Sequence, residues 1–260
     1  MNESDLRLIW KHEEEIAHVH GWDFSHLRHR YESNEELLPW DYQMVVSKYM
    51  RPTDRILDID TGGGEELLHF GHPYKLTSAT EGYPPNVELC KRVLTPLGID
   101  FREMTDFHHM PFENESMDII LNRHGDYDID EIFRVLRPGG TFIMQQVGEE
   151  NDREIVKLLI PDADTPFPGM CLDIQKPLFE SKGFTILESG EAFEPIIFYD
   201  IGALVWFARI IEWEFPGFSV DSNFAALLHA QKIIEQKGRI EGRTHRFLIV
   251  ARKPSSVRPF

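Results

Sequence analysis

Residues 55–64 read RILDIDTGGG, and they contain more structural information than any other part of the chain. An apolar run ends in the acid Asp58 and continues into three consecutive glycines, Gly62 to Gly64, ahead of an apolar helical segment. Glycines leave backbone N–H groups that a ligand can approach without meeting a Cβ. The segment predicts a strand, a ligand-binding turn and a helix, although a glycine run alone is also typical of an ordinary tight turn.

Length and charge limit the classes of protein to consider. The 260 residues suit one α/β domain with additions, and such a chain buries a core without disulfides or a metal. The formal charge is 27 − 44 = −17, which opposes non-specific binding to nucleic acid or to an anionic membrane. We therefore expect a small-molecule substrate rather than a nucleic acid, and a monomer or homodimer.

Cysteine usage and the apolar segments point to a cytoplasmic protein without a membrane span. Cys90 and Cys171 are the only cysteines, too few for a disulfide framework or a zinc site. The first 15 residues lack the basic start and apolar core of a secretory signal. The longest apolar stretch, residues 196–211, contains two charged residues and is shorter than a membrane span of about 20 residues.

Predicted strands and helices alternate through most of the chain. Residues 4–20 and 34–50 are predicted to form an N-terminal helical cap, residues 1–50, ahead of a domain that covers residues 51–260. The domain is predicted to have helices at 65–70, 84–97, 129–136 and 172–182, and strands at 55–59, 75–80, 99–104, 117–121, 141–147, 184–188 and 245–251. This alternation predicts a mostly parallel sheet with helices on both faces, which binds ligands beyond the carboxyl ends of its strands. An aromatic insertion, residues 194–235, precedes the last strand, and its aromatic side chains either pack in a core or line a pocket over the substrate.

Four motifs in order resemble those of the class I S-adenosylmethionine-dependent methyltransferases. The first is Asp58-Ile59-Asp60-Thr61-Gly62-Gly63-Gly64, and the second is Glu81, 81 − 58 = 23 residues further on. Asp106 in MTDFHHMPF takes the third place, and DIILN followed by IFRVLRPGGTFIM takes the fourth. The resemblance covers residues 55–147 and implies a Rossmann-like, mostly parallel seven-stranded sheet whose last strand is antiparallel.

The same resemblance implies which residues bind S-adenosylmethionine and its product S-adenosylhomocysteine. Glu81 would accept hydrogen bonds from the ribose hydroxyls, Asp106 would accept from the adenine amino group, and Tyr42 would donate to the methionine carboxylate. The loop Asn122-Arg123-His124-Gly125-Asp126 would lie near the reacting centre, where His124 is the candidate general base. The full set of candidate cofactor-binding residues is Asp58, Asp60, Thr61, Gly62, Gly64, Glu81, Gly82, Asp106, Phe107, Asn122 and Tyr42. No metal site is expected, because the histidines near the N-terminus lack a tight carboxylate or cysteine partnership.

Asp60 departs from the family pattern, which has glycine at this position. A carboxylate here would either pair with the ammonium group of the cofactor or crowd its carboxylate, and like charges in a poorly solvated pocket are costly. We predict that cofactor affinity is weaker than usual and that Asp60→Gly increases it.

Other classes of protein remain as alternatives. The contiguous glycines do not form the Gly-x-Gly-x-x-Gly fingerprint of nicotinamide-binding Rossmann domains, and no Gly-Lys-Ser/Thr of a P-loop follows them. A non-catalytic or regulatory cofactor-binding protein is one alternative function. An RNA methyltransferase that uses the basic residues between 231 and 260 is another.

Overall fold

The computed structural model describes residues 2–18, 24–33 and 35–255. Contacts divide the chain into two compact units. The first unit comprises Met1–Leu38, Gly148–Pro168 and Ala192–His245, and the second comprises Pro39–Val147, Gly169–Glu191 and Arg246–Phe260. The predicted cap of residues 1–50 is thus shared between the units, with residues up to 38 in the first and the rest in the second.

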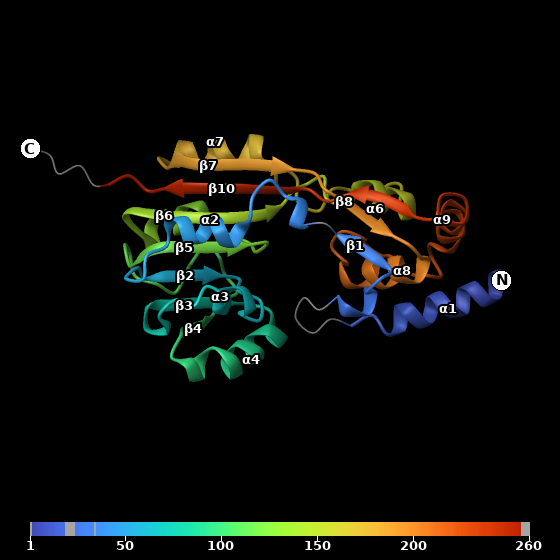
Figure 1. Ribbon diagram of the computed structural model, residues 1–260, viewed down its shortest axis with the longest axis horizontal. Coiled ribbons are helices and arrows are strands. Elements are labelled where there is room, and N and C mark those ends of the chain that lie inside the picture. The colour runs from blue at the N-terminus through green and yellow to red at the C-terminus, as the bar shows by residue number, and fades with distance from the viewer. Residues whose placement is uncertain (1, 19–23, 34, 256–260) are drawn as a thin grey trace, which may run out of the picture. The chain divides into compact units, whose positions relative to one another are not determined.

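The second unit is built on a seven-stranded sheet in the order β4-β3-β2-β5-β6-β10-β7 (Figure 1). Strands β2 to β6 are parallel to one another, and β10 is antiparallel to β6. The arrows of β10 and β7 also point in opposite directions (Figure 1). The predicted seven-stranded, mostly parallel sheet with an antiparallel last strand is confirmed. The strands are β2 (Ile56–Ile59), β3 (Thr77–Glu81), β4 (Asp100–Glu103), β5 (Met117–Arg123), β6 (Leu136–Val147), β7 (Thr185–Ala192) and β10 (Arg246–Arg252).

Side chains that alternate along the strands separate into two cores, one on each face of this sheet. Ile56 and Leu121 pack in one core, with residues of α2 (Tyr42–Tyr49), α3 (Glu65–His69) and α4 (Pro84–Val93). Leu57 and Ile120 pack in the other, with residues of α5 (Ile129–Val135) and α7 (Leu172–Lys182). A strand buried on both faces is expected to be apolar throughout, as ILDI in β2 nearly is. Helices therefore cover both faces, as the alternation predicts.

The first unit has its own sheet, a three-stranded antiparallel arrangement in the order β1-β8-β9. Its strands are β1 (Tyr31–Ser33), β8 (Pro195–Phe198) and β9 (Ile240–Arg243), and its helices are α1 (Glu3–Glu15), α6 (Arg153–Leu159), α8 (Ile201–Ile210) and α9 (Phe224–Lys237). Short 3₁₀ turns complete the two units: η1 (Ser25–Leu27), η2 (Glu35–Leu37), η3 (Tyr74–Leu76) and η4 (Thr95–Leu97). Arg30, the residue before β1, donates hydrogen bonds to Glu13 of α1 and to Asp200, the N-cap of α8, and so ties the start of β1 to both helices.

The sequence-based elements of the N-terminal region were partly wrong. The predicted helix over 34–50 is a short 3₁₀ turn at Glu35–Leu37 followed by α2, because Pro39 interrupts the helix and Asp41 caps the new one by accepting from Met44 N at 3.0 Å. The helix predicted over 4–20 ends at Glu15. Residues 19, 20 and 34 of these two predictions lie outside the described residues.

Candidate cofactor site

The glycine-rich turn joins the end of β2 to the start of α3. Gly62 and Gly64 have positive φ angles of 64° and 84°, a backbone conformation that favours glycine. Thr61 N donates to Thr80 O of β3 at 2.9 Å, and Gly64 N donates to Thr61 O at 3.1 Å. The first bond fixes the turn against β3 and the second closes the turn on itself, so a turn joins the strand to the helix as the sequence predicts.

Glu81 is a buried carboxylate at the carboxyl end of β3, beside this turn. Its Oε1 accepts hydrogen bonds from Gly82 N and Tyr83 N, both at 2.8 Å. Its Oε2 accepts from Gly62 N, also at 2.8 Å. Three backbone amides therefore hold the carboxylate in place and link the ends of β2 and β3. The Asn86 side chain adds a long contact of 3.4 Å to Oε2.

Asp58 lies inside the sheet, on β2, with only 8% of its surface exposed. Burial raises the pKa of the Asp58 carboxyl to about 7, although the Thr61 hydroxyl, which donates to it at 2.5 Å, lowers that pKa. The carboxylate of Glu66 raises the pKa further, and Arg123 lowers it. Arg123 and Glu66 form an ion pair at 2.7 Å, so the two effects come from one partly buried pair.

Asp60 has a left-handed backbone, with φ at 58°, at the position where the resemblance leads one to expect glycine. Asp tolerates this conformation better than most side chains do. The side chain lies against Gly125, where any added Cβ would be 2.4 Å from the Asp60 Cβ, so only glycine fits at 125. Burial, with the Glu81 charge second, raises the pKa of Asp60 to about 7.

Asn122, at the end of β5, is fully buried and holds the following loop. Its Nδ2 donates to Asp126 O at 3.3 Å, and its Oδ1 accepts from Gln146 Nε2 at 2.8 Å. The buried Tyr42 hydroxyl donates to Asn122 O at 3.4 Å. Tyr42 and Asn122 are thus brought together, as two members of the predicted site.

His124 lies in that loop with a positive φ of 65°. Its Nε2 is 3.1 Å from Gln145 Nε2, and Gln145 Oε1 accepts from Trp40 Nε1 at 2.8 Å. Because an indole N–H can only donate, the amide nitrogen of Gln145 must face the imidazole. His124 Nε2 is then the acceptor, which places the proton of the neutral ring on Nδ1.

Asp106 and Phe107 follow β4 in a surface loop. Asp106 accepts hydrogen bonds from His108 N at 2.9 Å and from His109 Nδ1 at 2.7 Å. The His109 hydrogen bond lowers the pKa of Asp106 below its ordinary value. Phe107 packs against the core that α5 and α7 cover. Asp106 thus follows the carboxyl end of β4, the strand next to β3, as the motif order predicts. Its two carboxylate oxygens accept hydrogen bonds from His108 and His109.

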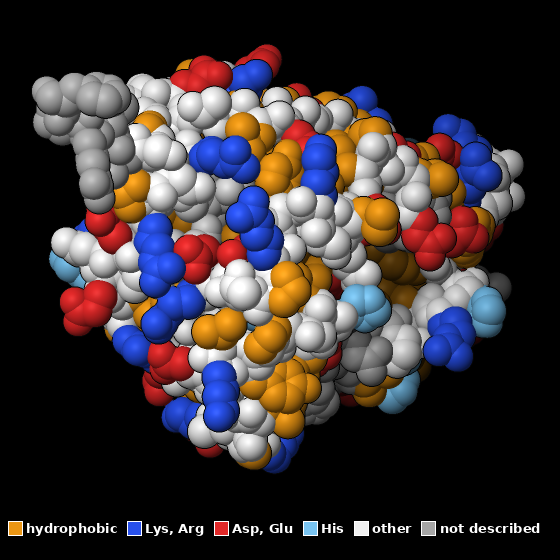
Figure 2. Space-filling model, turned by 60° about the vertical axis from the view of Figure 1, so that its left-hand side comes forward, with side chains coloured by type: hydrophobic (Ala, Val, Ile, Leu, Met, Phe, Trp, Pro, Cys, Tyr) orange, Lys and Arg blue, Asp and Glu red, His pale blue; other side chains and the backbone are white. Residues whose placement is uncertain are grey.

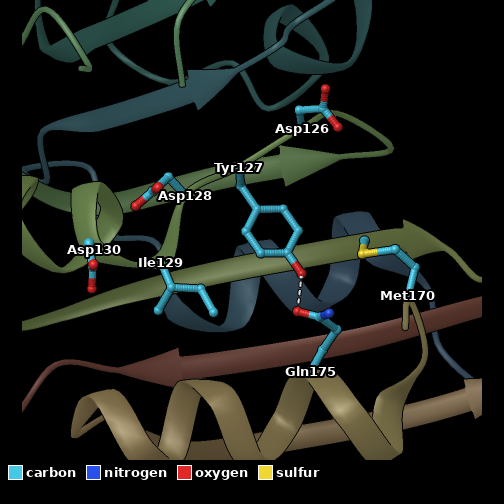
Figure 3. A pocket seen from close by; sticks show the side chains of 7 residues that line it. All are labelled: Asp126, Tyr127, Asp128, Ile129, Asp130, Met170 and Gln175. Atoms are coloured by element: carbon cyan, nitrogen blue, oxygen red, sulfur yellow. Dashed lines mark hydrogen bonds between the residues drawn. The ribbon is translucent and has the colours of Figure 1, made fainter. Parts of the chain in front are cut away.

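A cavity of about 380 Å³ lies where the loop after β5 meets the start of α7. The Tyr127 ring points toward Gln175, whose Oε1 accepts from the Tyr127 hydroxyl at 2.8 Å (Figure 3). Ile129 and Met170 add apolar surface. Three carboxylates complete the lining, of which Asp128 pairs with His108 and Asp130 with Lys182.

The sequence did not predict several of these contacts. The glycine at 125 and the Arg123–Glu66 pair have no local signature, because each depends on a residue about 60 positions away. Gln145 and Gln146 follow the apolar run Phe142–Met144 of β6, and two adjacent polar residues there are a signal from which a polar site at the end of this strand could have been predicted.

The aromatic insertion packs mainly in a core rather than around a pocket. Trp206 and Phe215 are buried in the core of the first unit, at 2% and 1% exposure, while Trp213 is exposed. Large aromatic residues stabilise such a core through the area they bury.

Basic residues near the C-terminus are dispersed. Arg239 pairs with Glu241, Arg243 pairs with Glu154, and Lys253 is buried. On the face shown in Figure 2, lysines and arginines are interspersed with acidic and hydrophobic side chains. Within residues 2–18, 24–33 and 35–255, no group of histidine, cysteine and acidic side chains could hold a metal ion. Across the same ranges, no helix is both long and apolar enough to cross a membrane.

Comparison with known proteins agrees with this fold. Residues 57–144 match the family described as "Methyltransferase domain". A protein of Mycobacterium leprae (strain TN), named phthiotriol/phenolphthiotriol dimycocerosates methyltransferase, is 32% identical over 109 residues, which cover 38% of this chain and 40% of that protein. The chain thus matches about two-fifths of the length of such curated relatives.

Solved structures extend the similarity to the fold of nearly the whole chain. A Bacillus halodurans C-125 protein, provisionally named a methyltransferase, has a TM-score of 0.59 at 16% identity and covers 83% of this chain and 99% of its own. The [4+2]-cyclase SpnF has a TM-score of 0.52 at 16% identity and covers 98% of this chain and 96% of its own. The strand order and the solved structures define a Rossmann-like fold, and residues 57–144 within it match the methyltransferase-domain family.

Proposed function

We propose that the chain transfers a methyl group from S-adenosylmethionine to a small-molecule acceptor. The observation that carries the proposal is the position of Glu81, whose buried carboxylate accepts from Gly62 N at 2.8 Å and so lies at the mouth of the glycine-rich turn. Backbone amides occupy three of its roughly four lone-pair sites, so the carboxylate can accept from a ribose hydroxyl on Oε2, in place of the long Asn86 contact. Each such charge-assisted hydrogen bond contributes about 1.5–3 kcal/mol, which is enough to orient a nucleoside.

The remaining candidate residues surround that position in a way that fits the cofactor. Asp106, Phe107 and Gly82 follow the strands next to Glu81 and would contact the adenine. Asp58, Asp60, Thr61 and Gly64 would lie along the methionine end, together with Asn122 and Tyr42. Arg123, which pairs with Glu66 beside Asp58, adds a cation that suits a carboxylate.

The residues of this chain would act mainly by positioning. The bound cofactor supplies an electrophilic methyl group on a sulfonium, so an in-line acceptor with a free lone pair needs little more than correct placement and exclusion of water. His124 is the candidate base for an acceptor that carries a proton. Its Nε2 lone pair accepts from Gln145 in the free protein, so an acceptor hydroxyl or amine would have to replace the Gln145 amide before His124 could take its proton.

The cavity next to this loop is our candidate binding site for a small acceptor. The cavity of about 380 Å³ begins at Asp126, two residues after His124, and combines the Tyr127 ring with the polar Gln175. Ile129, Met170 and the Tyr127 ring give the cavity apolar surface, and the three carboxylates and Gln175 give it polar groups that can orient a small molecule. The M. leprae relative is named for methylating phthiotriol and phenolphthiotriol dimycocerosates, which also favours an acceptor outside the nucleic acids.

Isothermal titration with two nucleosides tests the Glu81 assignment from the ligand side. Adenosine should bind the wild-type protein at least about tenfold more tightly than 2′-deoxyadenosine, because one charge-assisted hydrogen bond is lost. In Glu81→Ala the two nucleosides should bind equally, provided that circular dichroism shows the variant folded. Equal binding of both nucleosides to the wild type contradicts the assignment.

A radiolabel screen then separates an enzyme from a cofactor-binding protein. The protein is incubated with methyl-labelled S-adenosylmethionine and either metabolite extracts or ribosomal RNA. Label in a small molecule supports the proposal. Label in RNA would mean that the acceptor is RNA and not a small molecule. Binding of S-adenosylhomocysteine with no labelled product in either pool favours the non-catalytic alternative.

A further inference from the structure

The side chain of Gln145 links two rings near the carboxyl end of β6. Its Oε1 accepts a hydrogen bond from Trp40 Nε1 at 2.8 Å, and its Nε2 lies 3.1 Å from His124 Nε2. Gln145 is buried, at 2% exposure, so both ends of its amide need partners from the protein. Trp40, Gln145 and His124 therefore form one chain of hydrogen bonds that ends at the candidate base.

The backbone holds the amide and the imidazole in fixed positions. Gln145 pairs with Arg123 of β5 on one side and with Leu248 of β10 on the other, so it cannot shift without breaking the sheet. His124 N donates to Gln145 O at 2.9 Å, which anchors the loop residue to the same strand position. The positive φ of 65° at His124 is uncommon outside glycine, and such conformations cluster at functional sites.

Packing holds the Trp40 ring at the other end of this chain. The ring lies so close to Gly190 of β7 that a Cβ at position 190 would be 3.0 Å from Trp40 Cζ3. It also packs against the core that α2, α3 and α4 cover. An indole nitrogen can donate but cannot accept, so the packed ring always presents a donor to Gln145.

Trp40 thus decides which end of the Gln145 amide reaches His124. If the amide turned over, its NH₂ group would face the indole N–H, and two donors would meet in a buried position. The amide oxygen therefore stays on Trp40, and the amide N–H stays on His124. A neutral imidazole that accepts on Nε2 carries its own proton on Nδ1.

We propose that Trp40 and Gln145 are positioning residues for His124. They keep the proton of the neutral ring on Nδ1 and leave Nε2 as the nitrogen that takes a proton from the acceptor. The inference rests on the proposed function, because it assumes that an acceptor with an O–H or N–H reacts beside His124. In that step the acceptor keeps the electron pair of its O–H or N–H bond, and the proton forms a new bond with the Nε2 lone pair.

Gln145 holds the place of the acceptor in the free protein. The amide and the acceptor each present a hydrogen-bond donor to the same Nε2 lone pair of His124. Exchange of one donor for the other needs no change of tautomer. The ring is therefore already in the form that accepts a proton when the acceptor arrives, which is preorganisation of a general base.

Nitrogen-15 NMR of the imidazole rings measures this tautomer directly. Long-range proton–nitrogen spectra of histidine-labelled protein show which ring nitrogen carries the proton, and His124→Gln identifies the His124 signals by their loss. The spectra are recorded at about pH 8, where an ordinary imidazole is neutral. In the wild type we expect the proton of His124 on Nδ1.

Two substitutions should move the proton. Trp40→Phe keeps an aromatic ring against Gly190 but removes the N–H, so the Gln145 amide can turn over and a second set of His124 signals should appear, with the proton on Nε2. Gln145→Glu replaces the amide by a carboxylate, which only accepts and can accept from Trp40 and from His124 together. In this variant Nε2 of His124 should carry a proton in every molecule.

Tyr49→Phe is the matched control. The Tyr49 hydroxyl, in α2, donates to Glu188 of β7, so this variant also removes one side-chain donor beside β7. It leaves the bond between Trp40 and Gln145 in place, and the proton of His124 should stay on Nδ1. Circular dichroism checks that each variant is folded.

The radiolabel assay with a metabolite extract measures the consequence for methyl transfer. Gln145→Glu should lower the rate of label incorporation about 100-fold, because the lone pair of the general base is then occupied by a proton. Trp40→Phe should lower the rate less, and Tyr49→Phe should retain the wild-type rate.

The proposal is overturned if the wild-type ring carries its proton on Nε2, or if the Trp40→Phe spectrum is the same as that of the wild type. It is also overturned if Tyr49→Phe moves the proton as Trp40→Phe does, or if Gln145→Glu transfers label at the wild-type rate. Failure of the proposed function is different, because the wild-type protein then binds no S-adenosylhomocysteine in isothermal titration and transfers no label, whatever the tautomer of His124.

Discussion

Asp60→Asn should stabilise the second unit at alkaline pH and have little effect in acid. The pKa of Asp60 is about 7 in the folded protein against an ordinary 3.8, so the folded state holds the proton more tightly than the unfolded chain does. The stability that this proton gives is lost as pH rises from about 4 and is gone above about 7. The difference, 7 − 3.8 = 3.2, corresponds to about 4 kcal/mol at 1.36 kcal/mol for each pH unit.

Between pH 5 and pH 8, the free energy of unfolding of Asp60→Asn relative to the wild type should grow by about 2–3 kcal/mol, since part of the cost is already present at pH 5. Urea unfolding measures the free energy of unfolding of the whole chain. Hydrogen exchange of the amides in β2 and β5 measures the stability of the unit that contains Asp60. Glu180→Gln is the matched control, because it removes one negative charge from an exposed position of α7 in the same unit. The assignment of a protonated Asp60 is refuted if Asp60→Asn raises the free energy of unfolding equally at pH 5 and pH 8. It is also refuted if the effect of Glu180→Gln on that free energy grows with pH to the same extent.

Three further changes test the packing around the turn. Gly125→Ala should displace Asp60 and destabilise the unit by about 1–3 kcal/mol, since the new Cβ would lie 2.4 Å from the Asp60 Cβ, and most of this loss in urea unfolding should vanish when Asp60→Gly is combined with it. Gly64→Ala should cost about 1–2 kcal/mol in the same assay, because φ is 84° and the new Cβ would lie 2.7 Å from a core leucine side chain. In native protein at pH 8, iodoacetamide should label Cys171 and leave Cys90 unlabelled until urea is added, because burial raises the pKa of the Cys90 thiol to about 12; equal labelling rates contradict this.

The seven-stranded sheet and its glycine-rich turn were predictable because their signals are local. The turn at Gly62–Gly64 needs positive φ angles, and Gly183 ends α7 in the left-handed conformation at the residue where the sequence predicts the helix to stop. Strands β2 and β5 of the large sheet are mainly apolar runs, and helices separate most of the strands of this sheet. Each of these features depends on residues close in sequence, so the pattern specifies them without knowledge of the tertiary fold.

The first unit was harder to predict because its sheet depends on distant pairing. Strand β1 is three residues long and pairs with β8, so that Tyr31 lies opposite Phe198. Neither segment alternates long enough to be recognised as a strand in isolation. The apolar residues of the insertion have the helical spacing that α8 shows, but spacing alone could not distinguish a buried core from a pocket lining.

At the candidate site, positions were predictable and side-chain directions were not. The motif order placed Asp58, Glu81 and Asn122 on neighbouring strands near their carboxyl ends, where they lie. It could not predict that the Asp60 side chain packs against Gly125, because Gly125 lies in the loop after another strand.

A crystal structure with S-adenosylhomocysteine, grown at pH 8, is the most direct test of a cofactor site at this turn. We predict that a ribose hydroxyl contacts Glu81 and that the amino-acid end passes along Gly62–Gly64. A nucleoside bound elsewhere in the molecule, or no binding at saturating concentration, would contradict the assignment of this turn as the cofactor site.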